Sequence, residues 1–232
     1  MQHRLSDWPL WLVEGLAEYC ATPTTTKKGV VWDRLGTINA LNMATLRELD
    51  NPASNQVDGV VRPTAIRREP RLTQTESLIL KTRLTPTDYA QAWALTHYLA
   101  QKRGPDFWKF LKSMSQMPPL QPRTPEEQRS EFCKFFGDEL AKLDKKVDDH
   151  VRKLSRQPGY DRLPYYAVMF VQPLGAGVIR RAVKVSQSPQ VIQQWVQDII
   201  DPQGGVHTWQ AFPFLTRSQA NLTAEEWMRS FW

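Results

Sequence analysis

Cysteine is scarce in this sequence, and the few cysteines stand in no recognisable pattern. Cys20 and Cys133 are the only two, and they form neither a disulfide framework nor a metal-binding motif. We expect Cys20 to lie inside a buried helix, where a free cysteine acts as a small hydrophobe. Histidine is also rare, with four in 232 residues. His150 borders the apolar stripe of a charged helical pattern, where a partly exposed surface position is more typical than a metal ligand.

Long hydrophobic runs are lacking as well. The longest, from Trp8 to Ala21, contains two glutamates and is too short to cross a bilayer. The sequence therefore predicts no transmembrane segment. No signal peptide is visible at the N-terminus either.

Positive charge is in excess, but little of it is concentrated. The formal net charge is +6, and from Tyr160 onward six Lys and Arg face five Asp and Glu, so the excess falls in the first 159 residues. One dense group stands in a segment rich in proline and threonine: Arg62, Arg67, Arg68 and Arg71. A solvated basic loop and a phosphate-binding patch are both compatible with this group. We favour the loop and expect no nucleic-acid partner.

The residues that are present describe a globular protein. An apolar fraction of 41% and nine tryptophans are typical of a chain with one sizeable core, or a core with a small appendage. As far as Leu154, apolar residues recur mainly at helical spacing. The clearest helix start is Thr85-Pro86-Thr87-Asp88, which combines a capping threonine, a first-turn proline and an acidic third position. We expect that helix to run from Pro86 to about Lys102.

The pattern changes beyond Gln157-Pro158-Gly159. Two β-branched and aromatic runs between Tyr165 and Val185 predict a hairpin, and a helix, a third strand and a last helix follow. We therefore expect an α+β fold with a helical domain at 1–157 and a small two-layer domain, ordered ββαβα, at 158–232.

The first helix carries the strongest indication of function. Glu14 and Glu18 stand one turn apart in an otherwise apolar helix, so they share a face. A buried carboxylate is costly unless a cation, a metal or several donors meet it. Gly15 lowers helix stability by about 1 kcal/mol relative to alanine, which indicates that something packs close to the backbone there. An ordinary ion pair of Glu14 with an arginine, such as Arg34 or Arg47, is the competing interpretation.

The stretch Trp11-Leu12-Val13-Glu14-Gly15-Leu16-Ala17-Glu18-Tyr19 resembles the second zinc-binding helix of the gluzincin metallopeptidases, W-L-x-E-G-x-A-x-Y. As far as about Leu154 the chain is similar to peptidase-MA-like bacterial proteins of unknown function. The resemblance implies a zincin fold, with Glu14 as the third zinc ligand and Glu18 as a group that orients a histidine ligand. It also implies that Tyr89 donates to the oxyanion of the tetrahedral intermediate, although a core tyrosine is an equal alternative.

The family's H-E-x-x-H helix is missing from this sequence. Only thirteen residues precede Glu14, and the pattern occurs nowhere else, so two zinc ligands and the general base are lacking. We therefore expect Met1 to be an internal start, a misplaced gene start or the result of a real truncation. A signal peptide would be lost with the missing part, so the sequence does not determine the cell compartment. An extracytoplasmic location is compatible with the sequence.

Two functions follow as hypotheses. The first is a fragment of a zinc-dependent metallopeptidase-like protein, which in complete form binds zinc and cleaves a peptide or protein substrate. Taken alone, this chain is expected to bind no zinc and to be inactive. The second is a non-catalytic binding or scaffold module derived from the zincin fold, in which no H-E-x-x-H is encoded upstream.

Overall fold

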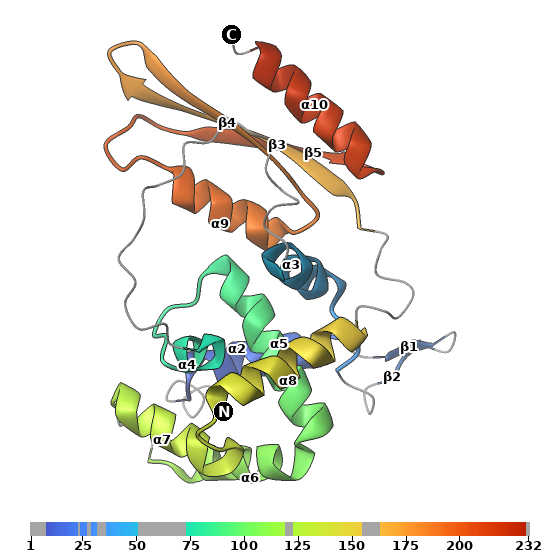
Figure 1. Cartoon of the computed structure of the whole chain (residues 1–232), viewed down its shortest axis with the longest axis vertical. Helices are drawn as coiled ribbons and strands as arrows, with labels where there is room; N and C mark the ends of the chain where they lie inside the picture. Colours follow the sequence, from blue (N-terminus) through green and yellow to red (C-terminus); the bar gives the residue numbers. More distant parts are fainter. Residues whose placement is uncertain are drawn as a thin grey trace. The chain divides into compact units, whose positions relative to one another are not determined.

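The computed structural model confirms the expected α+β class, with many helices and a small antiparallel sheet (Figure 1). It describes residues 8–22, 24–26, 29–31, 36–50, 73–118, 123–154 and 163–230, with the backbone alone for 24–26 and 29–31. The basic group from Arg62 to Arg71 lies outside these residues.

The chain divides into two compact units. The first comprises residues 1–43 and 68–157, and the second comprises 44–67 and 158–232. The expected domains, 1–157 and 158–232, differ from these units in the assignment of residues 44–67, and as folding domains they stay a prediction.

The first unit is mainly helical. Its elements are α2 (Leu10–Cys20), the strands β1 (Thr24–Thr26) and β2 (Gly29–Val31), the start of α3 (Ala40–Asp50), α4 (Gln74–Ile79), α5 (Pro86–Lys102), α6 (Gly104–Gln116), α7 (Pro125–Phe136) and α8 (Leu140–Leu154). The predicted helix from Pro86 to Lys102 is confirmed at both ends, because local capping groups set its start. β1 and β2 form an antiparallel hairpin that the sequence did not reveal.

Aromatic side chains fill the core of this unit. Trp11 of α2 stacks on Phe110 of α6 and meets Phe132 of α7 edge-on, with ring centroids 6.2 and 5.6 Å apart. The ring centroids of Phe132 and Phe136, both on α7, lie 4.7 Å apart. One aromatic cluster of Trp11, Phe110, Phe132 and Phe136 therefore joins α2, α6 and α7.

The expectation of a helix buried on nearly every side is wrong for α2. Trp11, Leu12 and Gly15 are buried, whereas Ala17 and Cys20 are exposed. Cys20 is thus not a buried hydrophobe, because it lies on the side of α2 opposite to the core contacts. The core therefore covers only some of the apolar residues of α2.

The second unit has a three-stranded antiparallel sheet in the order β4-β3-β5. Its elements are β3 (Tyr165–Gly175), β4 (Val178–Ser186), α9 (Pro189–Ile199), β5 (Thr208–Phe214) and α10 (Arg217–Ser230), with the rest of α3. The predicted hairpin is confirmed, with Ala167 opposite Val185 across β3 and β4.

Helices cover both faces of this sheet (Figure 1). Ala167, Val183 and Val185 pack on Ala220 and Ala224 of α10. Phe170 and Ala182, which point to the other face because side chains alternate along a strand, pack on Val196 of α9. The arrangement is helix–sheet–helix, whereas the sequence led us to expect one layer of sheet and one of helices.

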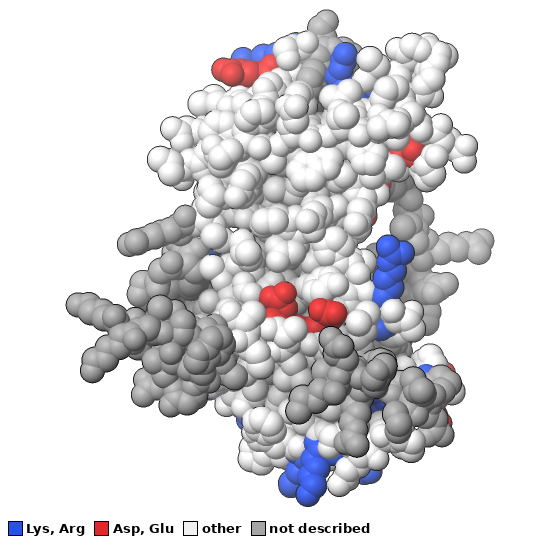
Figure 2. All heavy atoms as spheres, turned by 180° about the vertical axis from the view of Figure 1, so that it is seen from behind, with Lys and Arg blue, Asp and Glu red and all other residues white. Residues whose placement is uncertain are grey.

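Figure 2 shows the charged side chains on one face of the molecule. On the face in Figure 2, described Lys and Arg stand singly or in small groups and form no continuous basic field there. No described helix combines the length and apolarity that a membrane crossing requires.

Candidate functional site

Glu14 and Glu18 lie on one face of α2, as the sequence predicted. Both are partly buried. Within the described residues, Glu14 has no hydrogen bond and no ion pair, so it is not neutralised by Arg47; Arg34 lies outside the described part. The partly buried Glu14 carboxylate thus has neither a cation nor a hydrogen-bond donor in the part of the chain that the structure describes.

Glu18 is held by two amides. Asn39 and Asn42 both donate through Nδ2 to its Oε2, at 2.9 and 3.0 Å. Oε1 of Glu18 accepts no hydrogen bond from any described residue. The carboxylate is therefore fixed through one oxygen, while the other can accept a further hydrogen bond.

Gly15 lets α2 approach the backbone of α5. A Cβ at this position would lie 2.6 Å from the carbonyl oxygen of Ala92 and would also collide with the hydroxyl of Thr96. The close approach inferred from the sequence is confirmed, and its partner is α5. Glu14 precedes this crossing point by one residue.

Tyr89 lies on α5, one turn before Ala92, and is partly buried against the aromatic core. Glu14 and Tyr89 are therefore both within about one helical turn of the α2–α5 crossing. This placement is compatible with a shared site. It is equally compatible with a core tyrosine, so the catalytic role of Tyr89 stays a prediction.

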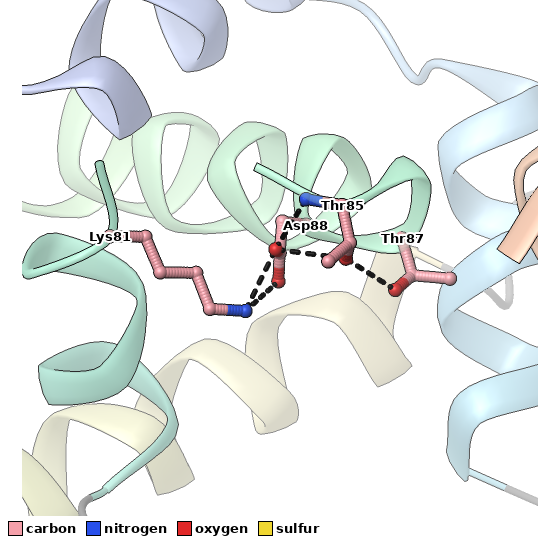
Figure 3. Close-up of polar contacts among 4 residues, drawn as sticks. All are labelled: Lys81, Thr85, Thr87 and Asp88. Carbon is pink, nitrogen blue, oxygen red and sulfur yellow. Dashed lines mark hydrogen bonds and ion pairs between the residues drawn. The ribbon is translucent and has the colours of Figure 1, made fainter. Parts of the chain in front are cut away.

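The first turn of α5 is fixed by a buried carboxylate (Figure 3). Asp88 is 2% exposed and accepts both an ion pair from Nζ of Lys81, at 2.7 Å, and the backbone N–H of Thr85, at 2.7 Å. The hydroxyl of Thr85 donates to the same carboxylate at 2.9 Å. Tyr89 follows Asp88 directly, so this cluster holds the backbone that carries Tyr89.

A segment that begins at Gly36 covers the C-terminal half of α2. Gly36 has a φ of 73°, and its Cα faces the ring of Tyr19 so closely that a Cβ would collide with it. Thr37 and Thr22 exchange hydrogen bonds, including Thr37 Oγ1 to the Thr22 carbonyl at 2.8 Å. We call residues 36–42 the Gly36 segment; it supplies both asparagines that hold Glu18.

Two buried histidines meet beside this segment. Nδ1 of His97, on α5, and Nε2 of His150, on α8, are 2.9 Å apart, and Nε2 of His97 lies 2.9 Å from the Gly36 carbonyl oxygen. His97 and His150 are only 4% and 7% exposed. Burial lowers the pKa of His97, and burial together with His97 lowers the pKa of His150 to about 4.

The expected surface position of His150 is therefore wrong. The residue borders the apolar stripe of α8, as predicted, but α5 covers it. The missed partner, His97, stands four residues after Trp93 on the packing face of α5, and that spacing is the sequence signal for its burial.

The described residues do not by themselves complete a metal centre. Among them, no three His, Cys, Asp or Glu side chains converge as metal ligands. Catalytic zinc takes three protein ligands, and Glu14 is the one that the motif resemblance predicts in this chain. The residues present thus fit part of such a site and no more.

Comparison with protein families matches residues 1–121 to the family described as "Protein of unknown function (DUF1570)". No curated protein and no solved structure matches the chain. The match spans 121 of the 232 residues, which is just over half. The chain therefore belongs to the DUF1570 family.

Proposed function

We propose that this chain carries the second half of a gluzincin-like zinc site and is a fragment of a zinc-dependent metallopeptidase-like protein. The observation that carries the proposal is the state of Glu14. It is a partly buried carboxylate beside a tight helix crossing, and no described residue pairs with it. The motif resemblance gives that carboxylate the role of a zinc ligand.

Glu18 supports the same proposal. Because both asparagines bond Oε2, its other oxygen is available to accept the ring N–H of a histidine ligand. Such an acceptor fixes the tautomer and the orientation of a metal-binding histidine. The H-E-x-x-H histidines would have to come from outside this sequence.

Three residues of this chain, Glu14, Glu18 and Tyr89, have a part in the proposed chemistry. The Glu14 carboxylate would hold the cation, Glu18 would orient a histidine ligand, and the Tyr89 hydroxyl would donate to the oxygen that becomes negative during peptide hydrolysis. Bound zinc supplies Lewis acidity toward a carbonyl and lowers the pKa of water. Lys81 and Asp88 hold the turn that positions Tyr89.

The alternative is a non-catalytic binding or scaffold module. It is favoured by one observation: the sequence contains no H-E-x-x-H, so it lacks the two histidines that a catalytic zinc of this family needs. Translation of the DNA upstream of Met1, in frame, separates the two. An H-E-x-x-H shortly before Met1 supports the peptidase fragment, and its absence supports the binding module.

Zinc binding provides the direct test. The 232-residue chain is loaded with zinc and then dialysed against zinc-free buffer. We expect metal analysis to find far less than one zinc per chain. Retention of one zinc per chain would contradict the prediction. If an upstream H-E-x-x-H is encoded, the extended protein should bind one zinc, and Glu14→Gln should abolish that binding.

Two further variants of the extended protein separate the remaining roles. Glu18→Gln should weaken zinc binding by about 10- to 100-fold. Tyr89→Phe should lower kcat by about 10²- to 10³-fold while zinc content stays unchanged. Glu139→Gln, at an exposed ion pair on the surface, serves as the control and should change neither.

A further inference from the structure

We propose that His97 and His150 form an acid-sensitive latch that fastens the Gly36 segment and the C-terminal half of α8 to α5. The latch does not depend on the proposed function. It depends on one chain of hydrogen bonds through two buried rings, from α8 to α5 and on to the Gly36 carbonyl.

The direction of these hydrogen bonds follows from chemistry. A carbonyl oxygen only accepts, so Nε2 of His97 carries a proton and donates to Gly36. In the neutral ring Nδ1 is then an acceptor, and it accepts from the N–H at Nε2 of His150. Both of these hydrogen bonds therefore form while both rings are neutral.

Protonation breaks this arrangement. When both rings are charged, N–H faces N–H across 2.9 Å, and the bond between the helices is lost. Even a single charge is costly, because the rings of Tyr19, Trp93 and Tyr98 surround the pair.

The charged groups around the latch add to this effect. Lys102, on α5, disfavours charge on both histidines, and Lys153, on α8, disfavours charge on His150. No carboxylate among the described residues contributes to either pKa; the nearest element on the α2 side presents the Tyr19 ring. A buried pair with cations nearby and no counter-ion in this part of the chain is suited to open in acid.

Two elements depend on the latch. The Gly36 segment carries Asn39 and Asn42, which hold Glu18. His150 is the buried residue of the last two turns of α8, since its neighbours there are exposed or half-buried. Opening of the latch therefore loosens the support of Glu18 and the end of α8 together.

The pH window follows from the shifts. In the closed form the pKa values of both histidines are lowered from 6.5, so the open form binds protons more readily. The closed form therefore keeps its full stability only above pH 6.5 and loses it as the pH falls. As the pH falls from 6.5 to about 4, His150 alone reduces the ratio of closed to open forms by about 80-fold, and the full reduction, from well above pH 6.5 to well below pH 4, is about 300-fold. His97 adds to this reduction.

Hydrogen exchange on the full chain tests the latch. After correction for the intrinsic rate, amides of the Gly36 segment and of residues 147–154 should lose protection between pH 6.5 and 4, while the aromatic core keeps it. In His97→Gln/His150→Gln, whose amides can replace the donors but do not titrate, this loss should disappear. His207→Gln, at a histidine stacked on Phe170 in the other unit, is the matched control and should behave like the wild type.

Equal loss of protection in the wild type and the double variant would overturn the proposal, as would a wild type whose two segments stay protected at pH 4. Titration of the wild-type histidines by NMR covers the case in which the double variant does not fold. His150 should titrate below pH 5, and ordinary values near 6.5 for both His97 and His150 would equally overturn the latch.

Discussion

Single residues of this protein have roles that depend on contacts of a few ångströms. Gly15 shows this most clearly, because α5 lies where its side chain would be. Thr96, whose buried hydroxyl has no hydrogen-bond partner in the described structure, is one of the groups in that space. The position of α2 against α5 thus depends on the absence of a side chain at Gly15.

Substitution of this glycine is our prediction at the residue scale. Gly15→Ala should lower the free energy of unfolding by about 1–3 kcal/mol, because the methyl group overlaps Ala92 and Thr96 and forces the helices apart. Chemical denaturation followed by tryptophan fluorescence measures it.

Gly104→Ala is the matched control. No atom lies within 4 Å of a Cβ at this glycine, so alanine there should be neutral or stabilising by less than about 1 kcal/mol. Equal effects at the two glycines would show that α2 does not press on α5.

At the scale of elements, helix starts are the best-defined features. α5 and α7 begin with the same device, a threonine, a proline and an acidic residue that closes a capping box. In α5 the acidic residue, Asp88, is also buried and paired with Lys81. Its cap therefore joins α5 to the preceding turn as well as starting the helix.

We expect Asp88→Asn to lower the free energy of unfolding by about 1–3 kcal/mol. The change leaves the Lys81 ammonium without its partner and weakens two further hydrogen bonds, although the lysine is partly exposed and partly solvated. Urea denaturation at neutral pH provides the measurement.

The control for this cap is Glu139→Gln. Its pair with Lys142 is exposed on both sides, so the variant should lie within about 0.5 kcal/mol of the wild type. A comparable loss at both positions would mean that burial of Asp88 adds nothing to the interaction.

At the scale of the whole molecule, the chain order and the compact units do not coincide. Residues 44–50 of α3 belong to the unit formed otherwise by 158–232. Glu48 shows why, since its carboxylate accepts from the hydroxyl of Ser186, at 2.7 Å, and from the backbone N–H of Gln187, at 2.7 Å. Burial raises the pKa of Glu48, which indicates that the ionised group is only partly compensated.

Glu48→Ala should therefore weaken the second unit selectively. Loss of the acceptor leaves the Gln187 N–H without this partner, and we expect a cost of about 1–3 kcal/mol. Hydrogen exchange at neutral pH should show reduced protection in β3, β4 and α9, with α5 and α8 unchanged. Glu226→Ala, at an exposed position on α10, is the control. Equal loss of protection in α5 would contradict the assignment of Glu48 to the second unit.

Much of the local structure was predictable. Capping groups and prolines lie beside the backbone they cap, so the start of α5 followed from a short stretch of sequence. The position of Glu14 and Glu18 on one face of α2 was also predictable, because helical spacing alone determines it. The proposed roles of Glu14 and Tyr89 remain predictions from a motif.

Contacts between distant residues were not predictable in the same way. His97 and His150 are 53 residues apart and Glu48 and Ser186 are 138 apart, and no local pattern couples such positions. The exposure of Cys20 was missed for a related reason, because apolar spacing shows which residues can be buried but not how much surface the neighbouring elements cover.

By itself, the sequence determined where helices begin, which carboxylates share a helical face and which glycine requires a close neighbour, because these depend on residues within a turn or two. Only the tertiary structure decided that α5 is that neighbour, that two asparagines hold Glu18, and that buried hydrogen bonds link His150, His97 and the Gly36 carbonyl. Those outcomes depend on which surfaces meet, and that choice is made by the packing of the whole unit.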